Sequence, residues 1–294
     1  MAISQISAED RLEAFEHSLS QVYPVNKDFV LDSARRLTGP GLLWSHCGAV
    51  LDVFCQKSAG EQALSLWQSQ ARTLLEQIGW NNQHATSRVF EGGLNLAISA
   101  PMDQLYSAVA VAQLAWYQLL DELKGVSTPA PESLLAQLDQ IMQSEANPAL
   151  MGLLNAAAEH DVDALCDDDD LSLGHGTGSR CWSVSALPEP DPVPWQDLHD
   201  IPVALITGTN GKTTTTRLCF AIARAAGLRA GLTSTDFVRV EDEILDHGDY
   251  SGPGGARMLL RDRRVEMAYL EVARGAILRR GLPLRRARAA LVNN

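Results

Sequence analysis

Between Thr207 and Thr214 the chain carries glycine, hydroxyl and lysine side chains at a spacing that suits phosphate binding. Glycines let backbone N–H groups turn toward phosphate oxygens, and Lys212 can reach the terminal phosphates of a nucleotide. The hydroxyl group of Thr213 is of the kind that binds Mg²⁺ beside those phosphates. The predicted nucleotide-binding residues are Gly208, Thr209, Asn210, Gly211, Lys212, Thr213 and Thr214.

The elements that flank this loop come in the order that such a site requires. Residues 203–206 form a continuous apolar run typical of a buried strand, and a helical pattern follows the loop as far as Gly227. Strand, loop and helix in this order bring the start of a helix against bound phosphate. A Gly-Lys-Thr triplet also occurs by chance in ordinary loops, but seldom with both flanking elements.

Length and composition indicate a folded chain of about two domains. The 294 residues are 46% hydrophobic and 20% charged, and no apolar run approaches the roughly 20 residues of a membrane helix. We therefore expect a cytoplasmic protein with no membrane partner. The five cysteines are odd in number and lack zinc-site spacing, so buried reduced thiols are expected rather than disulfides or a metal centre.

The net charge of −12 is unevenly distributed along the chain. From Ile201 onward there are 15 lysines and arginines against 9 acidic residues, whereas the preceding part has 9 against 27. The acidic part argues against a nucleic-acid partner, and the basic part suits a polyphosphate or an acidic substrate. Pairing of these arginines with acids inside the fold is the alternative interpretation.

The chain is predicted to divide into two domains joined by a linker. The expected parts are an α+β domain over residues 1–165, a Gly/Pro/acid-rich linker over 166–200, and an α/β domain with a parallel sheet over 201–294. Periodicity predicts helices over 8–22, 61–78, 102–123 and 131–160, and strands over 49–54 and within 87–98.

Two features of the predicted linker carry chemically active side chains. The four aspartates at 167–170 lack the alternating ligand spacing of a calcium loop, so a solvated acidic loop is the preferred interpretation. The sequence identifies no partner for His175, and a catalytic role for this histidine is only a speculation.

From residue 201 onward the chain resembles the central ATP-binding domain of Mur ligases and, within that group, the Mur-like module of cyanophycin synthetases. Ile206 stands where the general phosphate-loop pattern has its first glycine, and the shorter form found here is the Mur ligase variant. Shorter segments near the amino terminus resemble the first domain of cyanophycin synthetases. The blocks that carry the resemblance are residues 207–215, 233–236, 248–257 and 270–282, with 35–40 and 102–106 in the first domain.

This resemblance implies an ATP-dependent ligase that activates a carboxylate as an acyl phosphate and joins it to an amine. It implies that Lys212 and the loop amides bind the β- and γ-phosphates, and that Thr213 and Glu271 hold Mg²⁺. Lys212 and Glu271 are therefore the catalytic candidates. Glu271 follows the largely apolar run 265–270, and parallel sheets bind ligands at the carboxyl ends of their strands. A surface acid is the alternative interpretation of this glutamate.

The expected partners are a small-molecule, peptide or polymer substrate with a carboxylate, and an amino acid. A second copy of the chain is a further candidate partner. For Arg257 and Arg274, substrate binding and an ion pair inside the domain are both open. Three departures from the family pattern bear on activity. No ATP-grasp domain fits between residues 150 and 201, and Ala276 replaces an expected second glycine. The chain also stops at a predicted strand, residues 290–294, before the family's metal-binding histidine, so we expect an incomplete ligase domain with a free strand edge.

Two other classes of function compete with a ligase. A nucleotide-binding regulatory or interaction protein would bind ATP without turnover. A kinase or other phosphate-loop NTPase would need an aspartate at the end of a strand, and Glu271 occupies that place instead, so this class ranks last.

Overall fold

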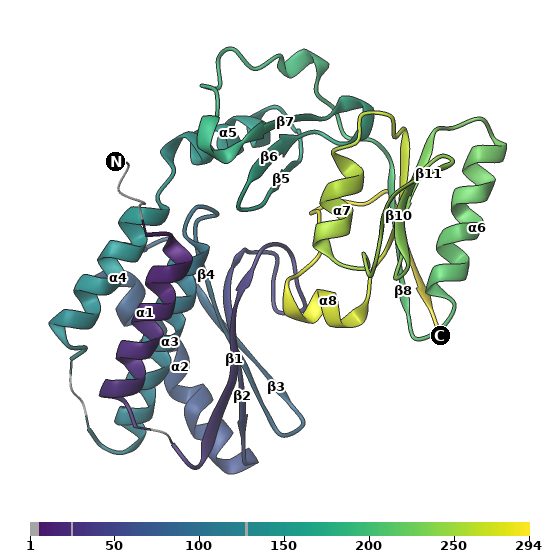
Figure 1. The fold of residues 1–294 in the computed structure, drawn as a ribbon. Coiled ribbons are helices and arrows are strands. Elements are labelled where there is room, and N and C mark those ends of the chain that lie inside the picture. Colours follow the sequence, from purple (N-terminus) through teal and green to yellow (C-terminus); the bar gives the residue numbers. More distant parts are fainter. Residues whose placement is uncertain (1–5, 25, 127–128) are drawn as a thin grey trace. The chain divides into compact units, whose positions relative to one another are not determined.

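The structure is a computed structural model that describes residues 6–24, 26–126 and 129–294. These residues belong to two units (Figure 1). The N-terminal unit comprises Met1–Thr38 and His46–Ala146, and the C-terminal unit comprises Gly39–Ser45 and Asn147–Asn294. Within the described ranges, no helix is long and apolar enough to cross a membrane.

The N-terminal unit is a four-stranded sheet with helices on one face (Figure 1). The strands lie in the order β1-β2-β4-β3, and every neighbouring pair is antiparallel. The strands are β1 (Phe29–Leu37), β2 (Gly48–Cys55), β3 (Ala85–Phe90) and β4 (Gly93–Ser99). The helices are α1 (Ala8–Val22), α2 (Lys57–Gln77), α3 (Leu105–Leu123) and α4 (Glu132–Glu145).

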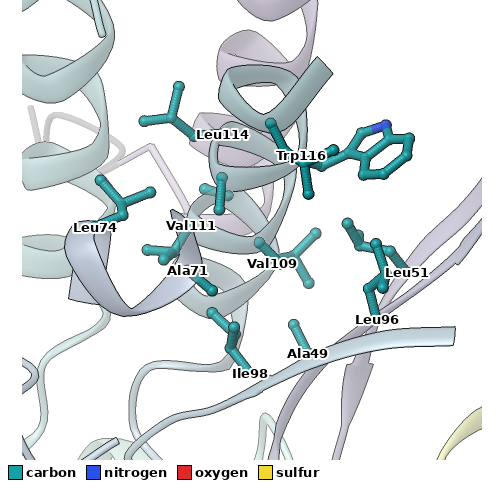
Figure 2. Close-up of a cluster of buried hydrophobic side chains, with 14 of the residues drawn as sticks. Ala49, Leu51, Ala71, Leu74, Leu96, Ile98, Val109, Val111, Leu114 and Trp116 are labelled. Carbon is teal, nitrogen blue, oxygen red and sulfur yellow. The ribbon is translucent and has the colours of Figure 1, made fainter. Parts of the chain in front are cut away.

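The core of this unit lies between the sheet and helices α2 and α3. Ala49 and Leu51 of β2 are fully buried and point to the same face of the sheet. Figure 2 shows them in one cluster with Val109 of α3 and with Ala71 and Leu74 of α2. Helix α3 is apolar around most of its circumference because the sheet, α1, α2 and α4 all pack against it.

Most of the elements predicted for this unit are present, with two differences. The helix over residues 8–22 and the strands within 49–54 and 87–98 are confirmed. Strand β1 was not predicted, because its sequence mixes charged and apolar residues without clean alternation. The single helix over 131–160 is wrong: α4 ends at Glu145, and α5 (Pro148–Glu159) begins at a proline that cannot continue a helix. The side chain of Asn147 accepts a hydrogen bond from the Leu150 amide (3.0 Å) and caps α5.

Residues 166–200, which the sequence predicts as a linker, contain regular structure in the C-terminal unit. Strands β5 (Ala164–Cys166), β6 (Asp170–Leu173) and β7 (Arg180–Ser183) form a small antiparallel sheet. Leu171, Leu173 and Leu198 are buried in a cluster with residues of α5. The glycines are required by packing: a Cβ at Gly178 would lie 2.2 Å from the carbonyl oxygen of His199. The glycine content therefore reflects close backbone contact, which composition alone does not distinguish from a flexible linker.

A six-stranded sheet forms the centre of the C-terminal unit, in the order β11-β10-β9-β12-β8-β13. Its strands are β8 (Val203–Gly208), β9 (Ala230–Thr233), β10 (Phe237–Val240), β11 (Glu243–His247), β12 (Met267–Glu271) and β13 (Ala289–Asn293). Strands β9, β12, β8 and β13 are parallel, whereas β10 and β11 are antiparallel to their neighbours. The sheet predicted as parallel is therefore mixed: β10 and β11 are antiparallel because the short connections before and after β10 can join only antiparallel strands.

Helices cover both faces of this sheet (Figure 1). Helix α6 (Lys212–Ala225) packs on one face over Ile206 and Leu232, and α7 (Pro253–Leu260) packs on the other over Val203 and Leu270. A short helix, α8 (Arg274–Arg279), follows β12. Because β8 and β12 are buried on both faces, their sequences are almost continuously apolar. Burial on both faces also fixes the positions of their carboxyl ends, where the candidate site lies.

Candidate nucleotide-binding site

The predicted phosphate loop joins the end of β8 to the start of α6. Gly208 has φ +137° and Gly211 has φ +74°, two conformations that glycine adopts far more readily than other residues. No side chain caps the amino terminus of α6, so the first amide groups of that helix remain available to an anion. Thr209, Asn210, Gly211 and Thr214 are exposed, and Thr213 is half-buried. The loop therefore presents backbone donors to solvent at a helix start.

Lys212 lies at the first position of α6 and folds back over the loop. Its Nζ donates to the carbonyl oxygen of Gly208 (3.1 Å) and more weakly to that of Thr209 (3.5 Å). Neither partner is charged, so the ammonium group has no carboxylate to release when an anion arrives. Its position lets it exchange these carbonyl contacts for phosphate oxygens.

Glu271 ends β12, the strand next to β8. The register pairs Glu271 with Ile206, two residues before Gly208. The side chain is only 2% exposed, and its Oε2 atom has no hydrogen-bond partner. A buried carboxylate oxygen without a partner costs free energy, so it marks a position where a cation or a donor from a ligand fits.

Thr233 is a candidate that sequence reasoning did not single out. It ends β9, the strand on the other side of β12, and its register partner is Leu270. Thr233 is 1% exposed, and its Oγ1 atom is also buried without a partner. Three adjacent parallel strands thus end in Gly208, Glu271 and Thr233. The unpartnered oxygen atoms of Glu271 and Thr233 therefore lie at the carboxyl ends of the strands, where the loop also begins. Only its position at a strand end, beside a block already noted at residues 233–236, could have indicated Thr233.

The protein side chains at this edge do not form a metal cage on their own. Across the part of the chain that the structure describes, no group of three or more His, Cys, Asp or Glu side chains could hold a metal ion. Mg²⁺ often binds through one or two protein ligands together with substrate phosphates. The single buried carboxylate of Glu271 is compatible with that kind of site.

Known proteins resemble the chain over part of its length. No protein-family model matches it. Cyanophycin synthetase of Synechocystis sp. is 52% identical over 82 residues, which is 28% of this chain and 9% of that protein. Cyanophycin synthetase of Geminocystis herdmanii is 49% identical over 94 residues, 32% of this chain and 11% of that protein. The UDP-N-acetylmuramoylalanine–D-glutamate ligase of Nitratidesulfovibrio vulgaris is 40% identical over 68 residues, 22% of this chain and 15% of that ligase.

The chain is Mur ligase-like and related to cyanophycin synthetase. Its α/β structure with mixed sheets is consistent with a Mur ligase-like fold. The matched stretch spans about a tenth of the length of the cyanophycin synthetases. The relatives are ligases, which supports a ligase of this kind.

Arg257, one of two arginines with an open role in this Mur ligase-like chain, forms an ion pair inside the C-terminal unit. Its Nε lies 3.3 Å from Asp167, which also binds Arg261 at 2.7 Å. Burial alone would raise the pKa of Asp167, but hydrogen bonds from Asp170 and Arg261 outweigh it and lower that pKa. The prediction of a wholly solvated acidic loop is wrong for Asp167. Arg274 begins α8 and is exposed, so substrate binding remains open for it.

His175 is buried close to two acids. The ring is 2% exposed, with Nε2 3.7 Å from Asp163 and Nδ1 3.7 Å from Asp200. Burial raises the pKa of Asp200, although the nearby His175 opposes that shift. The cysteines are free as predicted, but none is fully buried, and Cys181 is exposed. Burial and the adjacent Asp167 raise the pKa of Cys166 to about 12, which argues against a reactive thiolate there.

Proposed function

We propose that this chain binds Mg²⁺-ATP at residues 208–214 and supplies the nucleotide-binding part of a carbon–nitrogen ligase of Mur or cyanophycin synthetase type. The observation that carries the proposal is the buried, unpartnered Oε2 of Glu271 on the strand beside the loop. Most buried carboxylate oxygens are hydrogen-bonded, so an unpartnered one beside the loop suits a cation or a ligand donor. The relatedness to named ligases supports the same conclusion.

Each residue then has a chemical role. Lys212 and the amides of Gly208, Asn210, Gly211 and Thr214 would bind the β- and γ-phosphates, while the Thr209 amide donates to Asn293. Thr213 and Glu271 would hold Mg²⁺, with Thr233 as a further oxygen ligand. Bound Mg²⁺ offsets the negative charge that would otherwise repel an incoming carboxylate. The carboxylate oxygen attacks the γ-phosphorus of ATP, ADP leaves, and an acyl phosphate forms. The amine of an amino acid then attacks the acyl carbon, phosphate leaves, and an amide bond results.

The carboxylate substrate is proposed to be acidic. The region from Ile201 carries six more basic than acidic residues, and Arg274 at the start of α8 is exposed beyond the end of β12. A net positive region beside a phosphate site attracts an anionic peptide or polymer more strongly than a neutral one.

Calorimetric titration with Mg²⁺-ATP tests the nucleotide site directly. The wild type is expected to bind, and Lys212→Ala is expected to bind at least tenfold more weakly, because it loses a charge-assisted contact of about 1.5–3 kcal/mol. Lys124→Ala is the matched control, since Lys124 lies in the N-terminal unit and pairs with Asp121. Failure of the wild type to bind would overturn the proposal.

Glu271→Gln separates the metal role from a structural one. Without nucleotide, the variant should be as stable as the wild type or more stable, because it removes a buried carboxylate without a full set of partners. With Mg²⁺-ATP, it should gain less thermal stability than the wild type, because its amide binds Mg²⁺ poorly. Glu266→Gln, at an ion-paired glutamate just before β12, serves as the control. Equal stabilisation of Glu271→Gln and wild type by Mg²⁺-ATP would exclude the metal role.

Phosphate release in the presence of acidic peptides and amino acids tests ligation. Nucleotide binding with no release under any combination would favour the alternative, a nucleotide-binding protein that does not ligate.

A further inference from the structure

Asn293, at the end of β13, contacts the candidate phosphate loop through both its backbone and its side chain. Its carbonyl oxygen accepts a hydrogen bond from the Thr209 amide at 3.0 Å. Its side-chain Nδ2 donates to Thr215 Oγ1 at 2.7 Å and to the Gly211 carbonyl oxygen at 3.4 Å. One residue therefore touches the beginning of the loop, its end, and the first turn of α6.

The loop is fitted to Asn293 by close backbone contact. Strand β13 pairs in parallel with β8, and the register ends at Asn293 opposite Gly208. A Cβ at Gly208 would lie 1.8 Å from the Asn293 carbonyl oxygen, so only glycine leaves room for this approach. The space beside Gly208 that a side chain would fill is thus occupied by the backbone of Asn293.

These contacts determine which loop donors remain for a ligand. The Thr209 amide is engaged by Asn293, whereas no side chain caps the amides at the start of α6. The hydrogen bond from Asn293 Nδ2 to the Gly211 carbonyl oxygen restrains the peptide group between Gly211 and Lys212. Gly211 has a positive φ and is the residue at which the chain enters the helix. A loop held in one conformation before binding loses less conformational entropy when phosphate arrives.

The rest of β13 has little apolar burial to hold it in place. Leu291 is 39% exposed and Val292 is 75% exposed. Its attachment to the unit therefore depends on the ladder to β8 and on the hydrogen bonds of Asn293. Whatever loosens the Asn293 contacts should loosen the strand end and the loop together.

We propose that Asn293 is a positioning residue that holds the phosphate loop in its binding conformation and so links nucleotide affinity to the seating of β13 on β8. The identity of the ligand, Mg²⁺-ATP, rests on the proposed function, whereas the contacts of Asn293 with the loop do not. Because linkage is reciprocal, bound nucleotide stabilises the seated strand by the same free energy that the seated strand adds to nucleotide binding.

Hydrogen exchange of the nucleotide-free chain tests the contacts first. Asn293→Ala should speed exchange in a peptide spanning residues 207–215 by about three- to tenfold, the size expected for losing one hydrogen bond of this kind. The matched control is Asn294→Ala, the neighbouring exposed asparagine. Equal exchange in the two variants would overturn the inference, whatever the chain binds.

The second measurement is the affinity of each variant for Mg²⁺-ATP, at a temperature where all variants are folded. If Asn293 only stabilised the fold, this affinity would not change. Asn293→Ala should raise Kd about three- to tenfold, and Asn294→Ala should leave it unchanged. Thr215→Val removes the acceptor of the shorter bond, so the double variant should bind no more than about twofold more weakly than Asn293→Ala. Additive effects, or an unchanged Kd in Asn293→Ala, would refute the positioning role.

The two measurements separate the two proposals. If the wild type binds no nucleotide but Asn293→Ala still accelerates exchange in the loop, the proposed function fails and the control of loop conformation by Asn293 stands. If the wild type binds and Asn293→Ala changes neither exchange nor Kd, the proposed function stands and the positioning role fails.

Discussion

Replacing Gly208 with alanine tests whether the end of β13 really closes against the loop. The added Cβ would come within 1.8 Å of the Asn293 carbonyl oxygen, 2.6 Å of its carbonyl carbon and 2.7 Å of its amide nitrogen. All three are backbone atoms of a paired strand, so no side-chain rotation relieves the clash. Gly208 also has φ +137°, which an alanine rarely adopts.

The cost of Gly208→Ala follows from these two effects. Overpacking costs about 1–3 kcal/mol, and a sparsely populated backbone conformation costs about 1–3 kcal/mol more. The expected loss is therefore about 2–6 kcal/mol unless β13 detaches, in which case the strand itself is lost from the sheet. Denaturant-dependent hydrogen exchange of peptides from β8 and β13 measures both outcomes separately.

Gly254→Ala is the control for Gly208→Ala, because Gly254 lies in α7 with nothing within 4 Å of the added Cβ. This change should be neutral or stabilising by up to about 1 kcal/mol, since alanine favours a helix more than glycine does. The reasoning is refuted if Gly208→Ala keeps wild-type protection in β8 and β13, or if the two variants lose equal stability. Either result would mean that the close approach of Asn293 does not exist in solution.

Three further changes test other parts of the fold. Asp167→Asn should destabilise the C-terminal unit by about 1–3 kcal/mol in urea at neutral pH, because Arg257 of α7 and Arg261 just after it lose their shared acid. Since the pKa of Asp167 is lowered in the folded state, the difference should shrink as pH falls below 3.8. Glu145 binds the first amides of α3, and burial raises its pKa above 4.5. The folded state therefore holds the Glu145 proton more tightly, and wild type should lose thermal stability relative to Glu145→Gln as pH rises above 4.5. Trp67→Phe removes the hydrogen bond from Nε1 to the Thr86 carbonyl and should cost about 1 kcal/mol or more in urea unfolding.

The elements with strong local signals were predictable from sequence. Helix α1 begins at a Ser7 capping box and shows clear apolar spacing, and β8 is an unbroken apolar run before glycine. Strand β1 escaped prediction because its arginines and aspartate make no alternating pattern. Its pairing with β2, including the contact of Arg35 with Asp52 across the ladder, is a tertiary feature that no local window contains.

Some residues of the candidate site were likewise predictable from sequence, and others were not. The loop and Lys212 were predictable because residues adjacent in sequence form them, and Glu271 because it follows a strand within a recognisable block. Thr233 and Asn293 were not, because what distinguishes them is the strand order that sets β9 beside β12 and β13 beside β8. The glycine-rich segment around Gly178 was predicted as a linker but is closely packed. Close packing and flexibility both favour glycine, so composition alone does not separate them.

The unsatisfied oxygens of Glu271 and Thr233 give the site a thermodynamic signature. Each buried polar atom without a partner costs about 1–3 kcal/mol, and both lie at the ends of strands whose interiors are otherwise well packed. A ligand that supplies the missing partners would remove that cost. If Mg²⁺-ATP satisfies these two oxygen atoms, it should stabilise the protein more than phosphate contacts with the loop alone would. That extra stabilisation distinguishes a working metal–nucleotide site from a loop that only resembles one.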